Sequence, residues 1–326
     1  MLTAYQATGS VGKHIVRELL QTGRHTVTAI TRGIKSDDVA DGLRVAEVDY
    51  DNEETLVEAL KGQQFFIISL AVTAPPDTQE KLIAAAAKAG VPWIMPNCYS
   101  PDFMDKEFAT ENMTGQRIWA GIDAIEKHDV SSWVGLACGF WYEFSLAISP
   151  AWYGFDFYNK KVTFYDDGKQ PINTSTMAQC GRAVAKFLSL KELPEDESDK
   201  TEATVSQWRN KALYTSSFLA SQRDMLDSVN RVMGLTDADW KINYQPASER
   251  YAQGIEMMRG GDRIGFAMAM YSRTFYSSGE GNSEARYGLA NEALGLQKED
   301  IDEATKLALT MVENGVGNAQ YSFAKK

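Results

Sequence analysis

The stretch from residue 2 to residue 32 constrains the fold of this chain more than any other. Leu2 to Tyr5 form a short apolar run, residues 11–20 carry apolar side chains at helical spacing, and His25 to Thr31 form a second run rich in β-branched residues. The predicted order is strand, glycine-containing turn, helix, strand. Unpaired backbone N–H groups and the positive end of the helix dipole converge at such a turn, which suits a pyrophosphate.

The turn carries an incomplete dinucleotide-binding fingerprint. The full pattern has three glycines, whereas this chain has Gly9 and Gly12 at the second and third positions and Gln6 at the first. If Gln6 must adopt backbone angles that glycine tolerates best, it is strained, and its side chain crowds the phosphates. This puts cofactor affinity in doubt, but not the fold. The alternative is an ordinary crossover whose glycines only make a tight connection.

Strand and helix patterns keep alternating as far as residue 138. Further strands are predicted at 44–49, 64–71, 91–96 and 132–138, and helices at 53–61, 77–89 and 117–128. This alternation predicts an α/β fold with a Rossmann-like, doubly wound parallel sheet. From Trp152 onward, strands at 161–165, 170–173 and 212–218 mix with helices at 174–190, 221–233, 249–258 and 300–313, and 277–288 is glycine- and serine-rich. We therefore expect a Rossmann domain over residues 1–150 and a smaller α+β domain over residues 151–326.

The charge balance narrows the class of partner. The formal net charge is −11 and the pI is near 4.9, whereas nucleic acid or an anionic membrane would need a basic face. The longest apolar run, FFIISLAV at 65–72, is too short to cross a bilayer, and no secretory leader pattern opens the chain. A soluble, cytoplasmic protein is expected, with neither nucleic acid nor membrane as its partner.

The cysteines and histidines do not suggest a metal site. The chain has three of each, widely spaced and without a C-x-x-C or H-x-x-x-H pair: Cys98, Cys138, Cys180, His14, His25 and His128. We expect the cysteines to be buried small hydrophobes and the chemistry to proceed without a histidine base.

A substrate pocket is expected beyond the carboxyl ends of the strands, where open α/β sheets bind their ligands. Asn97 to Tyr99 follow the fifth predicted strand, and the aromatic segment Gly139 to Phe144 follows the sixth. Both should share one rim with the turn at Gly9. The predicted pocket residues are Asn97, Tyr99, Phe140, Trp141 and Tyr142.

Several segments together resemble a known family. They are QATGSVGKHIVRELL at 6–20, ITR at 30–32, the Asp49-Tyr50 pair and GLANEALGLQKEDIDEATK at 288–306. The chain resembles the NmrA-like branch of the atypical short-chain dehydrogenases, with isoflavone reductases as close cousins, and WYEFSLAISPAWYGFDF at 141–157 is similar to fungal members. The resemblance implies a Rossmann domain with bound NADP and a smaller, partly interleaved C-terminal domain. It does not imply one reaction, because the branch contains both reductases and non-catalytic redox sensors.

The resemblance also implies a set of cofactor-binding residues. It places Thr8, Gly9, Ser10, Val11 and Gly12 around the phosphates. It places Asp49 beside the adenine and Leu70 beside the ribose. Arg32 falls at the 2′-phosphate of NADP. Its chemistry agrees, because an NAD site wants a carboxylate there for the ribose hydroxyls, whereas a guanidinium can fork onto a phosphate. The plainer alternatives are a solvated Arg32 and a core Leu70.

The usual catalytic pair of short-chain dehydrogenases is missing. That pair is a tyrosine and a lysine four residues apart on one helix, the lysine lowering the pKa of the tyrosine. Matching spacings occur at Tyr165 with Lys169 and at Tyr321 with Lys325, but neither lies in a predicted helix, so we assign both to chance.

Other catalytic candidates are weak. Isoflavone reductases carry a lysine on the helix before the sixth strand, where this chain has Ile118 beside Arg117, and isoleucine cannot be a base. Tyr142 would be a phenolic proton donor near the nicotinamide, and Lys106 a loop lysine that reaches the rim. Their alternatives are a packing aromatic and a solvated lysine.

Two functions of different class follow, and the sequence leaves both open. The first is an NADP(H)-dependent reductase of a carbonyl or conjugated double bond in a small organic substrate, favoured by the aromatic rim. The second is a non-catalytic NADP(H) redox sensor that acts through a regulatory protein partner, favoured by the missing catalytic residues. A third interpretation, motivated by Gln6 and the short first strand, is a relative with impaired cofactor binding or a truncated gene product.

Overall fold

A seven-stranded sheet forms the centre of the larger half of the molecule. The computed structural model describes residues 2–5, 9–33, 40–71, 73–196 and 203–316. The sheet has the order β3-β2-β1-β4-β5-β6-β11, and all its pairings are parallel. Its strands are β1 (Leu2–Tyr5), β2 (Val27–Thr31), β3 (Arg44–Glu47), β4 (Phe65–Ile67), β5 (Trp93–Met95), β6 (Ser132–Ala137) and β11 (Lys211–Tyr214). The predicted doubly wound α/β class is confirmed.

The strand order reverses between β1 and β4. From β1 the chain builds outward through β2 and β3, and then returns to add β4, β5 and β6 on the other side. A reversal of this kind leaves a crevice at the carboxyl edge of the sheet, where the two halves of the chain part. Gly9 follows β1 and Leu70 follows β4, so both lie at this edge.

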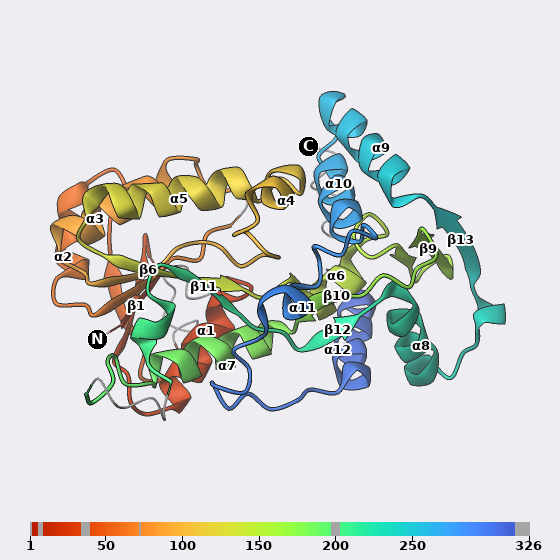
Figure 1. Cartoon of the computed structure of the whole chain (residues 1–326). Coiled ribbons are helices and arrows are strands. Elements are labelled where there is room, and N and C mark those ends of the chain that lie inside the picture. Colours follow the sequence, from red (N-terminus) through yellow and green to blue (C-terminus); the bar gives the residue numbers. More distant parts are fainter. Residues whose placement is uncertain (1, 6–8, 34–39, 72, 197–202, 317–326) are drawn as a thin grey trace.

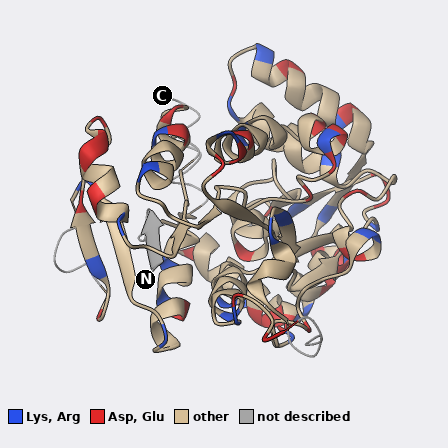
Figure 2. Ribbon diagram, turned by 60° about the vertical axis from the view of Figure 1, so that its left-hand side comes forward, with Lys and Arg blue, Asp and Glu red and all other residues tan. Residues whose placement is uncertain are grey.

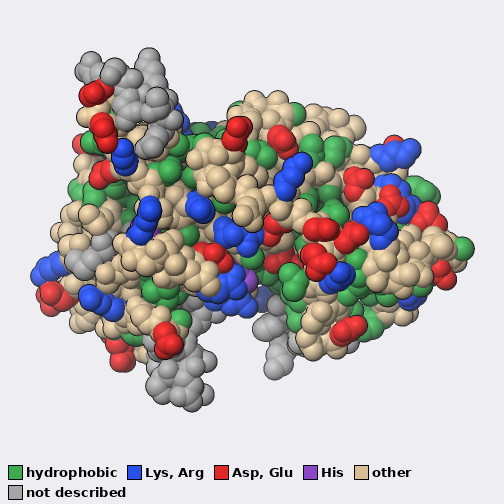
Figure 3. All heavy atoms as spheres, turned by 90° about the horizontal axis from the view of Figure 1, so that it is seen from below, with side chains coloured by type: hydrophobic (Ala, Val, Ile, Leu, Met, Phe, Trp, Pro, Cys, Tyr) green, Lys and Arg blue, Asp and Glu red, His purple; other side chains and the backbone are tan. Residues whose placement is uncertain are grey.

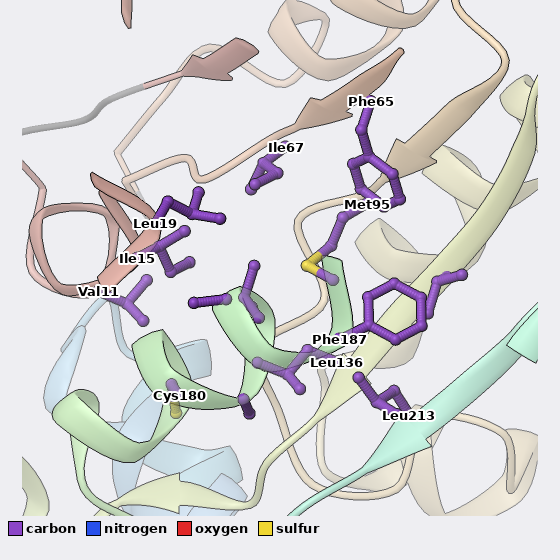
Figure 4. Packing of buried hydrophobic residues seen from close by; sticks show 14 of the residues in the cluster. Val11, Ile15, Leu19, Phe65, Ile67, Met95, Leu136, Cys180, Phe187 and Leu213 are labelled. Carbon is purple, nitrogen blue, oxygen red and sulfur yellow. The ribbon is translucent and has the colours of Figure 1, made fainter. Parts of the chain in front are cut away.

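Helices cover both faces of the sheet (Figure 1). One face carries α2 (Glu53–Leu60), α3 (Thr78–Lys88) and α5 (Gly115–His128), and the other carries α1 (Gly12–Gln21) and α7 (Met177–Leu188). Figure 4 shows side chains of α1, α7 and the sheet meeting in one cluster. The two helices approach so closely that a Cβ on Gly181 would lie 2.6 Å from the backbone oxygen of His14.

Two elements that come late in the chain complete this larger half. The α7 helix packs against α1, and β11 pairs with β6 through Lys211 opposite Val134. Both come after residue 150. We propose a division into domains near residue 150, in which α7 and β11 cross back to the larger half, while β7 (Phe140–Trp141) and α6 (Tyr142–Ile148) precede residue 150 but pack in the other half.

The other half holds two small sheets with helices around them (Figure 1). One has the order β12-β10-β7 and the other β13-β9-β8. Their strands are β7 (Phe140–Trp141), β8 (Phe155–Asp156), β9 (Lys161–Tyr165), β10 (Ile172–Ser175), β12 (Phe218–Ala220) and β13 (Lys241–Gln245). The remaining helices are α4 (Lys106–Glu111), α6 (Tyr142–Ile148), α8 (Gln222–Met233), α9 (Ala247–Arg259), α10 (Ile264–Thr274), α11 (Ser283–Tyr287) and α12 (Ile301–Glu313).

Some elements do not follow from the sequence patterns. The residues of α10 are small or apolar on nearly every side of the helix, so α10 lacks the single apolar stripe that marks an amphipathic helix. It packs against α9 at a glycine pair, since a Cβ on Gly265 would lie 2.4 Å from the backbone oxygen of Gly254. The short α4 and β13 are also absent from the prediction, and α11 makes part of the expected loop at 277–288 helical.

Charges of both signs are spread over the surface. Figure 2 shows acidic and basic residues in both halves of the molecule, and Figure 3 shows them interspersed on one face. Among the helices in the described part of the chain, none is long and apolar enough to cross a membrane.

Candidate functional site

The α1 helix starts at the crevice, where the N–H of Lys13 donates to the Gly9 carbonyl at 3.1 Å and the N–H of His14 donates to the Val11 carbonyl at 3.0 Å. Val11 is the N-cap residue and is buried, and no side chain in the described residues caps this end. The first turn also contains no acidic residue that would offset the helix dipole. A helix dipole that no acidic side chain offsets favours an anion at the helix start. Gln6 and Thr8, which belong to the same predicted turn, lie outside the described residues.

The end of β2 carries an exposed guanidinium beside an aromatic ring. The Cζ atom of Arg32 lies 5.9 Å from the centre of the Tyr50 ring. Tyr50 also borders a hollow of about 270 Å³ together with Leu56 and Lys81. Asp49 is exposed, and its Oδ1 accepts the N–H of Asp51 at 3.0 Å. The end of β2 therefore carries a positive charge with an aromatic ring beside it.

A side-chain relay joins the loops that follow β4 and β5. Asn97 Oδ1 accepts the N–H of Leu70 at 3.0 Å, and the N–H of Asn97 is donated to Gln79 Oε1 at 2.8 Å. Gln79 belongs to α3 and does not follow from any sequence pattern. Its amide lies so close to α5 that a Cβ on Gly121 would be 2.2 Å from Gln79 Nε2. Gly121 therefore leaves the space that the Gln79 amide occupies.

An open pocket of about 110 Å³ lies beside this relay. It is lined by residues from the loops after β4 and β5, from α3 and from α5: Leu70, Ala71, Ala74, Pro75, Pro76, Gln79, Glu80, Asn97, Arg117, Ala120 and Gly121. Two predicted residues, Leu70 and Asn97, thus come together here. Arg117 joins them from the first turn of α5, whereas Ile118 is buried in the core. A guanidinium cannot serve as a base, but it can stabilise negative charge on an oxygen.

Tyr99 and Trp141 lie on the other face of the sheet from this pocket. Both pack against the cluster that includes Val11, Cys138 and Cys180. The Tyr99 hydroxyl and the Trp141 Nε1 atom are shielded from solvent and have no hydrogen-bond partner among the described residues. Burial raises the pKa of the Tyr99 hydroxyl, which therefore keeps its proton. Tyr99 and Trp141 are thus separated from Asn97, with which they were predicted to share a pocket.

Phe140 and Tyr142 point away from both places. Phe140 stacks on Tyr271 with ring centres 3.8 Å apart. Tyr142 is 0% exposed, its hydroxyl lies 2.8 Å from Thr305 Oγ1, and burial raises its pKa. The structure does not bring these two side chains to the strand ends, because neighbouring residues in β7 face opposite sides.

Lys106 and the two tyrosine–lysine spacings occupy unrelated positions. The Nζ atom of Lys106 lies 4.0 Å from the centre of the Trp119 ring, on the exposed side of α4. Tyr165 ends β9 and donates its hydroxyl to the Trp152 carbonyl at 2.5 Å, while Lys169 lies in the following turn. No helix carries this pair. Tyr321 and Lys325 lie outside the described residues.

One buried carboxyl group is a further feature that the sequence patterns do not predict. Glu143, in the first turn of α6, is 6% exposed, and its Oε1 accepts the N–H of Met177 at 2.9 Å. Its Oε2 atom has no hydrogen-bond partner among the described residues, and burial raises the pKa of the carboxyl group. The sequence does hold a signal, because Glu143 is the one charged residue in the stretch 133–148. A charge within so apolar a stretch indicates a role at a site or a helix end.

The parallel sheet, the reversal of strand order and a helix that starts at that reversal are features of dinucleotide-binding α/β proteins. Residues 7–96 match the NAD(P)H-binding protein family. A fungal relative, the oxidoreductase aprR of Aspergillus flavus, is 28% identical over 303 residues, which cover 91% of this chain and 94% of the relative. Residues 7–96 therefore carry an NAD(P)H-binding domain, and the fungal oxidoreductase agrees with the resemblance to the NmrA-like, isoflavone-reductase-like family.

Solved structures share the fold over nearly the whole chain. An isoflavone reductase superposes with a TM-score of 0.70 at 18% identity, covering 93% of this chain and 97% of its own. AtPrR2 with NADP⁺ and (+)-pinoresinol gives a TM-score of 0.69 at 16% identity, covering 94% and 98%. The NADPH-dependent quinone oxidoreductase QOR2 of Escherichia coli, with NADPH, gives 0.68 at 18% identity, covering 94% and 99%. At these sequence identities, the similarity to the solved structures shows a shared fold alone.

Proposed function

We propose that this protein binds NADP(H) and reduces a carbonyl or conjugated double bond of a small organic substrate. The observation that carries the proposal is the pairing of two features: the start of α1 at the reversal of strand order, which no side chain among the described residues caps, and Arg32 at the end of β2. The helix start suits a pyrophosphate, and Arg32 suits the 2′-phosphate that distinguishes NADP from NAD. The NAD(P)H-binding match over residues 7–96 supports it.

The proposed cofactor contacts follow the edge of the sheet. The phosphates would meet the turn and first helical turn at Thr8, Gly9, Ser10, Val11 and Gly12. Arg32 would hold the 2′-phosphate, with Asp49 and Tyr50 on the adenine side. Leu70, fixed by Asn97, would lie beneath the ribose and nicotinamide. Two of the fold relatives carry NADP⁺ or NADPH, which agrees with this choice of cofactor.

The chain itself supplies groups that suit a carbonyl oxygen. When bound, NADPH supplies a hydride from C4 of its nicotinamide. The pocket beside Leu70 and Asn97 has the guanidinium of Arg117 at its rim, and this group stabilises negative charge on a substrate oxygen. The relay through Gln79 holds the loop backbone in place. Pinoresinol in one fold relative and the quinone specificity of another support a small organic substrate.

A specific observation also favours the second function, a non-catalytic NADP(H) sensor with a protein partner. In the part of the chain that the structure describes, no helix carries the tyrosine–lysine pair of the short-chain dehydrogenases, since Tyr165 lies on a strand. Tyr142 is enclosed and Lys106 lies against Trp119. A sensor needs the cofactor site but not a proton donor, so these placements agree with it.

Nicotinamide fluorescence during titration with NADPH tests the cofactor proposal, with tryptophan quenching as the readout for NADP⁺. We expect saturable binding of both. Absence of binding at high micromolar concentration would remove both functions. If both ligands bind, consumption of NADPH is followed on a panel of enones, ketones and quinones. Turnover of any member supports the reductase, and silence across the panel supports the sensor.

A further inference from the structure

A surface groove of about 500 Å³ lies between the C-terminal halves of α1 and α7. The two helices pack side by side, and α1 lines the groove with Glu18 and Gln21 from its last turns. The turn at Gly9, which is assigned to the cofactor, precedes the other end of α1. The groove is therefore separate from the proposed cofactor and substrate site.

Three cations and one carboxylate line this groove. The cations are Arg24, Arg182 and Lys186, and the carboxylate is Glu18. Glu18 is already engaged, because its Oε1 accepts a hydrogen bond from Arg17 Nη2 at 2.8 Å. The groove is thus basic in a chain whose formal net charge is −11. A cleft lined by one sign of charge attracts groups of the opposite sign.

Two of the three cations have no carboxylate partner among the described residues. Lys186 makes no ion pair there, and the Arg24 guanidinium makes only a long contact to the Ser189 carbonyl, at 3.4 Å. Arg182, by contrast, is paired with Glu299. Arg24 and Lys186 are both exposed, so their charged ends can meet a negative group from outside the chain.

Stabilisation of helix ends explains these cations only in part. Lys186 lies in the last turn of α7, where a cation offsets the negative end of the helix dipole. However, α7 places Arg182 four residues before Lys186, and α1 places Lys13 four residues before Arg17. Like charges at this spacing weaken a helix. A negatively charged partner would relieve that repulsion.

The groove also has apolar lining. Ala185, Leu190 and Leu294 contribute it, and all three belong to or pack against the cluster that includes Val11. A small inorganic anion would leave this apolar surface in water, and the carbonyl groups at the two helix ends disfavour a compact anion beside them. An occupant that carries both carboxylates and an apolar side chain matches the whole lining.

We propose that this groove binds an acidic segment of a partner protein, whose carboxylates meet Arg24 and Lys186 while an apolar side chain contacts Leu190 and Leu294. A peptide segment supplies both kinds of group a few ångströms apart along one chain. The inference goes beyond the proposed function and does not depend on it, because the groove and the cofactor turn lie at opposite ends of α1.

Fluorescence anisotropy of a labelled Glu-Glu-Leu-Glu-Glu peptide tests the proposal. We expect saturable binding that weakens as added salt screens the charges. The same peptide with serine in place of leucine should bind more weakly, because it loses the apolar contact. A Lys-Lys-Leu-Lys-Lys peptide should not bind. Absence of binding by the acidic peptide, or equal binding of the acidic and basic peptides, would overturn the proposal.

Lys186→Glu locates the peptide in the groove. We expect this variant to lower the peptide affinity by about three- to tenfold, because an exposed attraction becomes a repulsion. Lys127→Glu is the matched control, since Lys127 is also an exposed cation in the last turn of a helix, on the other face of the sheet. Both variants lose a similar contribution at a helix end. Equal peptide affinities in the two variants would contradict the assignment to the groove.

Glu18→Gln gives an answer that misfolding cannot imitate. Removal of the one carboxylate in the groove should tighten peptide binding by about two- to threefold, whereas an unfolded protein would only lose binding. Unchanged affinity would count against the groove. Inorganic phosphate at the same ionic strength should not displace the peptide, and displacement would show a site for small anions instead.

NADPH titration separates this proposal from the proposed function. Lys186→Glu should bind NADPH as the parent protein does, because the substitution lies away from the cofactor turn. If the parent binds the acidic peptide but not NADPH, only the proposed function falls. If the parent binds NADPH but not the peptide, only this inference falls.

Discussion

Asn97 accepts the backbone N–H of Leu70 through its side-chain oxygen, at 3.0 Å, and so ties the loop after β4 to the loop after β5. This bond joins two residues 27 positions apart, at the edge of the sheet where a nicotinamide ring is expected. It explains why an amide, rather than an aliphatic side chain, suits position 97.

Asn97→Ala should loosen this edge of the sheet. The variant loses the acceptor for a partly buried N–H, so we expect the free energy of unfolding to fall by about 1–2 kcal/mol. NADPH should also bind more weakly, because the loop beneath its ribose is less fixed. Urea unfolding and NADPH titration check this, with Asn314→Ala at the exposed end of α12 as the control. If the free energy of unfolding and the NADPH affinity of Asn97→Ala both equal those of the parent protein, the bond from Leu70 to Asn97 contributes to neither stability nor binding.

Gly121→Ala should damage the same relay from the opposite side. The new Cβ would lie 2.2 Å from Gln79 Nε2, so the Gln79 amide must move and release the Asn97 N–H. We expect a loss of about 1–2 kcal/mol of stability. The double variant with Gln79→Ala removes the clash, so the effects should not add. Simple additivity of the two single variants in thermal or urea unfolding would contradict this account.

Arg32→Glu should change the preference between the two nicotinamide cofactors. A guanidinium on the 2′-phosphate makes charge-assisted hydrogen bonds, and its loss should weaken NADPH binding by roughly ten- to a hundredfold while leaving NADH much less affected. Fluorescence titration with each cofactor measures both constants. Arg259→Glu, at the exposed end of α9, makes the same charge change far from the site. Equal losses for NADPH and NADH would remove Arg32 from the proposed contacts.

His14 should make stability depend on pH in the mildly acidic range. Burial, followed by Arg17 and Lys13, lowers its pKa from 6.5 to about 4. The unfolded state therefore takes up a proton first, and stability that is fully present above pH 6.5 is lost as the pH falls toward 4. Because the ring is half-exposed, we expect the free energy of unfolding to fall by about 1–2 kcal/mol over this pH range.

Urea unfolding between these pH limits measures this loss. His14→Gln should flatten the curve, whereas His128→Gln, at the exposed end of α5, should leave it unchanged. A curve for His14→Gln that is as steep as that of the parent would exclude His14 as the cause.

Much of the fold could be predicted because its signals are local. The helical stripe of α1 and the apolar runs of β4 and β6 are set by neighbours in sequence, and they appear close to where the patterns place them. The end of β2 at Arg32 follows in the same way. By contrast, α10 is buried on most sides and has no periodic stripe, so its sequence gives little indication of a helix.

The candidate site was harder to predict because its contacts join distant residues. The aromatic segment after β6 was expected to line one pocket, but successive residues of β7 face opposite sides. Trp141 therefore packs, like Tyr99, against the cluster that includes Val11, while Phe140 and Tyr142 enter a different cluster. The link from Gln79 to Asn97 spans 18 positions and needs a glycine on a third element, which no local pattern reveals.

The sequence by itself determined the alternation of strands and helices, the glycine turn before α1 and the cation at the end of β2, because each is encoded within a few neighbouring residues. Only the tertiary structure decided that Leu70, Asn97 and Arg117 border one pocket, and that Glu143 is buried at the start of α7 with one oxygen unpaired among the described residues. The physical reason is that burial and hydrogen-bond pairing depend on which elements pack together, and periodicity along the chain does not specify those partners.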